Sequence, residues 1–88
     1  MLDQGLNRME VLKYELELSL IQIVSEGAQF YSLRAKTRTI ALEYPEYIVW
    51  SPELRGNQAV VDIWDRSWKR LASISVQASQ EMVNAPMW

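Results

Sequence analysis

The segment from Met9 to Val24 predicts a helix with two apolar faces, and this feature constrains the fold more than any other. Projected at about 100° per residue, its apolar side chains gather on two opposite sides. One side carries Val11, Tyr14, Leu18 and Ile21. The other carries Met9, Leu12, Leu16, Leu20 and Ile23. A surface helix usually has one apolar stripe, so a helix with two must be covered from both sides. In so short a chain, we expect the second cover to come from another subunit or a partner.

A strand is the alternative for part of this segment, because residues 15–20 alternate between polar and apolar side chains. The alternation ends where Leu20 and Ile21 adjoin, and the segment is rich in Leu, Glu, Lys and Met, which favour helix. We therefore predict an N-terminal arm over residues 1–6 and a helix over residues 7–36.

Residues 37–50 allow three interpretations: a strand with period two, an extension of the first helix as far as Pro45, or an extended apolar linker. The linker, packed on the helices, is the interpretation we prefer. The triplet Ser51-Pro52-Glu53 is typical of a helix start, with an N-cap residue, proline at the first position and an acid in the first turn. We predict a second helix over residues 51–84 and an apolar tail over residues 85–88.

These elements predict an all-α fold, in which two long helices form an antiparallel hairpin. The 88 residues are enough for one small domain, and a domain of this size is marginally stable by itself. Small domains compensate with disulfides, a metal or oligomerisation, and the chain has no Cys. We therefore expect oligomerisation into a helical bundle, with the first helix at its centre.

The chemistry open to the chain is limited by its composition. It contains neither His nor Cys, so the common nucleophile–base pairs and the usual metal and haem ligands are missing. We expect no catalytic residues, no cofactor and no metal. The net charge is −2, which gives no general attraction to nucleic acid. Without a predicted membrane span or signal peptide, we expect a cytoplasmic protein or a component of a virion.

Two groups of side chains are the candidate binding sites. Trp64 and Trp68 lie one turn apart on the apolar face of the second predicted helix, where they form either core or an interface anchor. Trp88 adds an aromatic ring to the tail. The predicted partner-binding residues are Val11, Leu16, Leu18, Ile21, Trp64, Trp68 and Trp88. A short basic cluster, Arg34, Lys36 and Arg38, offers phosphate contacts.

The function that these observations favour is non-enzymatic: a small interaction module or structural subunit of a larger assembly, which binds itself or another protein. The alternative is a small regulatory protein that contacts nucleic acid through Arg34, Lys36 and Arg38. A third interpretation is a carrier of an apolar ligand that uses the Trp pair.

Overall fold

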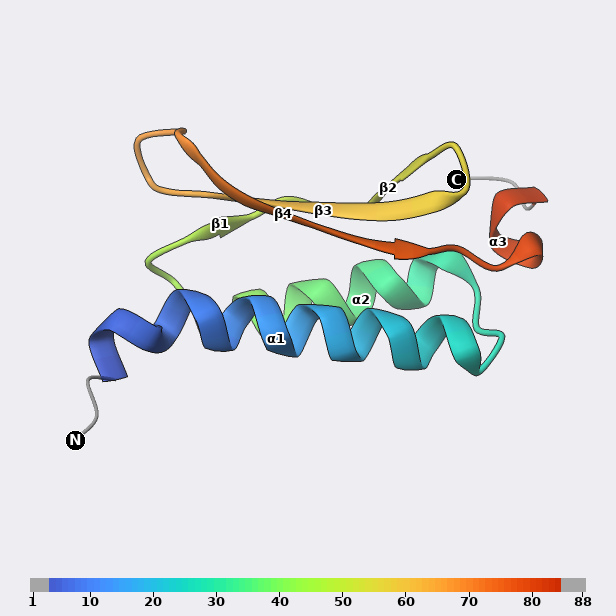
Figure 1. Cartoon of the computed structure of the whole chain (residues 1–88), viewed down its shortest axis with the longest axis horizontal. Helices are drawn as coiled ribbons and strands as arrows, with labels where there is room; N and C mark the ends of the chain where they lie inside the picture. The colour runs from blue at the N-terminus through green and yellow to red at the C-terminus, as the bar shows by residue number, and fades with distance from the viewer. Residues whose placement is uncertain (1–3, 85–88) are drawn as a thin grey trace.

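The computed structural model, which describes residues 4–84, places two helices against one face of an antiparallel sheet (Figure 1). In chain order the elements are α1 (Gln4–Ser25), α2 (Phe30–Ala41), β1 (Ile48–Val49), β2 (Glu53–Arg55), β3 (Gln58–Trp64), β4 (Arg70–Gln77) and α3 (Gln80–Asn84). The fold is therefore α+β, and the prediction of an all-α, two-helix hairpin is wrong.

The single helix predicted over residues 7–36 is two helices, because the chain turns at Gly27. The Gly27 amide donates to the Val24 carbonyl at 3.0 Å, and the Ala28 amide donates to the Ile23 carbonyl at 3.3 Å. This pair of bonds is the Schellman motif that ends many helices. Gly27 has a φ of +73°, which strains any residue with a Cβ atom.

The other predicted boundaries also change. α1 already begins at Gln4, inside the predicted arm, and α2 continues to Ala41, inside the predicted linker. The linker interpretation of residues 37–50 is wrong at both ends, since its first residues are helical and β1 lies near its end. The predicted tail, residues 85–88, lies outside the described residues.

The predicted helix over residues 51–84 is mostly sheet. β3 is the central strand: it pairs along its whole length with β4, and on its other edge with β2 and then β1. Between β1 and β2, the Trp50 amide donates to the Asp62 carbonyl at 2.8 Å, which continues the ladder. Gly56, with a φ of +63°, begins the two-residue turn between β2 and β3, as a type II′ hairpin requires.

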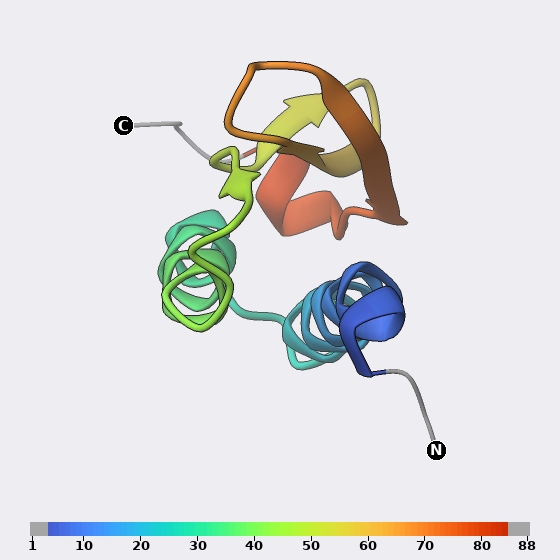
Figure 2. The same cartoon turned by 90° about the vertical axis from the view of Figure 1, so that its left-hand side faces the viewer.

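The core fills the space between the sheet and the two helices, with α1 beneath β4 and α2 beneath β1 (Figure 2). Alternate residues of β3, including Val61 and Ile63, face the helices, while Asp62 and Trp64 face the other way. Met82 of α3 joins the core at one end. The buried apolar side chains of this core are Leu12, Leu16, Leu20, Phe30, Leu33, Ile40, Tyr44, Ala59, Val61, Ile63, Ile74, Val76, Ala78 and Met82.

Polar contacts tie α1 to the segment that follows α2. The Tyr44 hydroxyl donates to Oε1 of Glu15 at 2.5 Å, and the Arg8 guanidinium pairs with the Glu46 carboxylate. The bond to Glu15, together with burial, raises the pKa of Tyr44 to about 12. These contacts hold one long side of α1 against its neighbour and leave its opposite side free.

Candidate functional site

α1 has two apolar faces, and only one of them is covered in the single chain. Leu12, Leu16 and Leu20 are fully buried under the sheet. The opposite stripe, which we call the α1 stripe, remains about half exposed or more: Val11 (48%), Tyr14 (64%), Leu18 (49%) and Ile21 (47%). Leu16, predicted to bind a partner, is therefore a core residue, whereas Val11, Leu18 and Ile21 are accessible.

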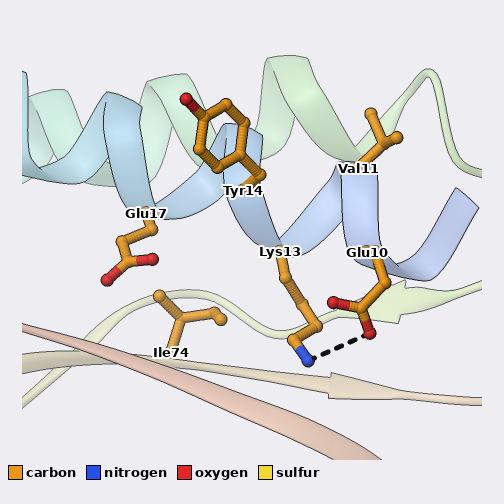
Figure 3. Close-up of a pocket in the computed structure, with 6 residues that line it drawn as sticks. All are labelled: Glu10, Val11, Lys13, Tyr14, Glu17 and Ile74. Atoms are coloured by element: carbon orange, nitrogen blue, oxygen red, sulfur yellow. Dashed lines mark hydrogen bonds and ion pairs between the residues drawn. The ribbon is translucent and has the colours of Figure 1, made fainter. Parts of the chain in front are cut away.

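A hollow of about 570 Å³ lies between α1 and β4, beside the α1 stripe (Figure 3). Val11 and Tyr14 line it from the stripe, and Ile74 lines it from the strand. Its charged rim includes Lys13, whose Nζ lies 3.3 Å from Oε2 of Glu10. The lining residues are Glu10, Val11, Lys13, Tyr14, Glu17 and Ile74. The hollow therefore brings one part of the stripe near β4, with the charged side chains of Glu10, Lys13 and Glu17 between them (Figure 3).

β4 is an open edge of the sheet over the described residues, because β3 is its only partner strand. It is eight residues long and contains no proline, and its single charged residue is Arg70 at its first position. The register shift opposite Ile63 and Trp64 places a bulge at Leu71, so the regular part of the edge is Ala72 to Gln77. Natural proteins usually protect edge strands with charges, proline or bulges, since unpaired backbone groups recruit another strand. The open edge of β4 and the α1 stripe are therefore two neighbouring features that the single chain leaves uncovered.

Three tryptophans cluster on the face of the sheet that points away from the helices. The Trp68 ring meets Trp50 and Trp64 edge-on, with ring centroids 5.9 Å and 6.0 Å apart. Trp64 and Trp68 do not share a helix face as predicted: Trp64 ends β3, and Trp68 lies in the following turn with a φ of +64°. Trp68 is 56% exposed, so the core interpretation of this residue is wrong. Trp50, which the sequence did not single out, completes the cluster.

A buried carboxylate lies next to this cluster. Asp62 accepts a hydrogen bond from the Ser73 hydroxyl at 2.7 Å and one from Nη2 of Arg55 at 3.1 Å. Burial raises the pKa of the Asp62 carboxyl, but the bonds from Ser73 and Arg55 outweigh burial, so the pKa lies below its ordinary value. An open hollow of about 360 Å³ is lined by Trp50, Glu53, Arg55, Asp62, Trp64 and Trp68.

Asp62→Asn should lower the free energy of unfolding at pH 7 by about 1–3 kcal/mol, because a charged acceptor of two hydrogen bonds is lost. The folded-state pKa is depressed, so this stability is present above the unfolded pKa of about 4 and is lost as pH falls through the folded pKa. Urea unfolding at pH 7 and in acid measures both effects. Glu43→Gln is the control, since the exposed Glu43 carboxylate makes no ion pair among the described residues. Equal stability of Asp62→Asn and the parent at pH 7 would contradict the prediction.

The structure divides the predicted basic cluster. Arg34 and Arg38 are four residues apart on α2 and line one hollow of about 140 Å³. Lys36 is exposed and, at two residues from each arginine, lies on the opposite side of the helix. The three cations therefore do not form one surface.

Trp88, the remaining predicted contact, lies outside the described residues. Within residues 4–84, no three His, Cys, Asp or Glu side chains gather as a metal site would require. None of the helices in that range has the length and apolar character needed to cross a bilayer. Comparison of the chain with protein-family models, curated proteins and solved structures finds no match.

Proposed function

We propose that the protein is a non-enzymatic assembly module that pairs with a second copy of itself through the edge of β4 and the α1 stripe. The observations that carry this proposal are that α1 and β4 lie on the same side of the molecule (Figure 2), and that Val11 and Tyr14 of the stripe line one hollow together with Ile74 of β4. Burying an apolar stripe is the main favourable contribution to most protein association. The α1 stripe supplies the apolar area to be buried, and the backbone of β4 supplies directional hydrogen bonds.

A second copy suits this surface because an edge strand and a helix can each pair with their own symmetry mates. Two β4 strands related by a twofold axis run antiparallel, which satisfies the open backbone groups of both. The same axis sets α1 antiparallel to its copy. The charged rim alternates as Glu10, Lys13 and Glu17, so an antiparallel copy can set each Lys13 near a carboxylate of the other chain.

Nucleic-acid binding, the alternative function, has less support. A protein that follows a phosphate backbone needs a continuous basic surface, whereas Lys36 lies across α2 from Arg34 and Arg38. The carrier interpretation depended on a Trp pair inside a helical bundle. Trp68 is instead largely exposed on the outer face of a sheet.

Light scattering coupled to size-exclusion chromatography tests the proposal. The parent chain should be a dimer at micromolar concentration, and Leu18→Glu should be a folded monomer. Leu18 is half exposed in the single chain, so a charge at this position destabilises the proposed interface and not the core of the single chain. Far-ultraviolet circular dichroism establishes that the variant is folded.

The matched control is Ala35→Glu, which introduces the same charge on an exposed position of α2. This variant should remain dimeric, because Ala35 lies on the other helix. A monomeric parent chain would overturn self-assembly. A dimer that persists in Leu18→Glu would overturn the assignment of the interface to α1.

A further inference from the structure

The hollow on α2 contains buried polar atoms that have no hydrogen-bond partner. Arg34, Thr37 and Arg38 line it from the helix, and Val49 and Ser51 line it from the segment around β1. Nε of Arg34 and Oγ1 of Thr37 are both buried and unpaired among the described residues. Thr37 as a whole is only 2% exposed. Buried polar atoms in native proteins nearly always have a partner, which is a protein group, an ordered water or an ion, so these two atoms make the hollow a candidate site for a bound group.

The charge of the hollow selects the chemistry of that ligand. Two arginines and no acidic residue belong to its lining, which consists of Arg34, Thr37, Arg38, Ala41, Val49 and Ser51. Across the described part of the chain, neither arginine makes an ion pair. Nε of Arg34 is a donor only, so the ligand must bring an acceptor. Two arginines without an acidic partner attract an oxyanion. Among oxyanions, phosphate suits arginine because the planar guanidinium group can donate two parallel hydrogen bonds to its oxygens.

Two side chains of the site, Arg34 and Thr37, are held in place before any ligand binds. The Arg34 guanidinium lies over the Phe30 ring, 5.3 Å from its centroid, and Phe30 is itself a core residue. Thr37 is fixed by its burial, whereas Arg38, the next residue of the helix, has an exposed side chain. Side chains that are already ordered lose little entropy on binding, which favours affinity for a small ion.

We propose that this hollow binds a single phosphate group, either as inorganic phosphate or as a small phosphomonoester. Arg34 and Arg38 supply the positive charge, and the hydroxyl groups of Thr37 and Ser51 donate to phosphate oxygens. The site lies beside α2 and β1, on the other side of the molecule from α1 and β4 (Figure 2). Phosphate binding is therefore independent of the proposed dimer, and each can fail without the other.

Calorimetric titration of the whole chain with inorganic phosphate, and separately with glycerol 3-phosphate, tests the proposal. Saturable binding of at least one probe at one site per chain is expected. A response to inorganic phosphate alone identifies a site for the free ion, and stronger binding of glycerol 3-phosphate identifies a phosphomonoester site. Arg38→Gln should weaken binding about tenfold or more, because a charged hydrogen-bond donor is lost. Lys36→Gln is the matched control and should bind as the parent does.

Thermal melting of Thr37→Val separates a ligand site from a structural defect. Without phosphate, this variant should be at least as stable as the parent, since a methyl group replaces a buried unpaired hydroxyl. Phosphate should raise the melting temperature of the parent and raise that of Thr37→Val less. The proposal is overturned if neither probe binds saturably to the parent, or if Arg38→Gln binds as tightly as Lys36→Gln.

Discussion

Replacing Leu16 with alanine should lower the free energy of unfolding by about 2–5 kcal/mol. The Leu16 side chain is fully buried at the middle of α1, where it packs in the core beneath the sheet. Removing it deletes apolar contacts and leaves a cavity that a close-packed core cannot fill. A domain of this size has a total stability of about 4–13 kcal/mol, so the variant loses a large part of it.

Leu18→Ala is the matched control, since it makes the same chemical change two residues away on the same helix. Leu18 belongs to the α1 stripe and is half exposed, so the single chain loses little. Urea unfolding at a low protein concentration, where the proposed dimer is dissociated, measures both variants. Similar losses in the two variants would show that both faces of α1 are covered within one chain, contrary to the structure.

Ile63→Ala should also cost about 2–5 kcal/mol, which makes it the second large effect. Ile63 is fully buried, belongs to the central strand, and faces the two helices. It is flanked by Val49 on one neighbouring strand and Ala72 on the other. The truncation therefore leaves a cavity at a point where three strands meet the helical layer. Thermal melting should show a loss of about 4–8 °C for each kcal/mol.

Trp68→Ala removes many more atoms but should cost only about 1 kcal/mol, from its edge contacts with Trp50 and Trp64. Trp68 is mostly exposed, and the turn that carries it is held by other groups. Oδ1 of Asp65 accepts hydrogen bonds from the amides of Ser67 at 2.8 Å and Lys69 at 2.9 Å. A larger loss in the free energy of unfolding for Trp68→Ala than for Ile63→Ala would contradict this prediction, because it would mean that contacts on the outer face of the sheet stabilise β3 more than the core does.

The part of the fold that the sequence predicted well is α1. Leu12, Leu16 and Leu20 recur at helical spacing over several turns, and this period distinguishes a helix from a strand without knowledge of any neighbour. The sequence also indicated the opposite apolar stripe, because the direction of each side chain follows from its position on the helix. The helix predicted over residues 7–36 runs through Gly27 and so misses the helix end at that residue. One glycine is tolerated inside many helices, so the presence of Gly27 alone does not predict that the helix ends there.

The fold of residues 51–84 was decided by tertiary structure. Ser51-Pro52-Glu53 has the residues of a helix start, yet Glu53 begins β2 because its backbone pairs with that of Val60. The candidate signals for a sheet were present: Ile74, Val76 and Ala78 alternate with polar residues, and Gly56 and Asn57 suit a hairpin turn. The apolar residues of β3 fit a helix face equally well.

In the candidate sites, too, the sequence determines one part and the tertiary structure determines the other. A helix alone places Arg34, Thr37 and Arg38 on one side, so their grouping depends only on the sequence. The hollow exists because β1 returns beside α2, which brings Val49 and Ser51 across from them. Likewise, the spacing of Val11 and Leu18 determines that they share a face, but the open edge of β4 beside them depends on strand order. Periodicity is a local property that the chain carries in its residues, whereas strand pairing joins distant segments whose match appears only in the folded molecule.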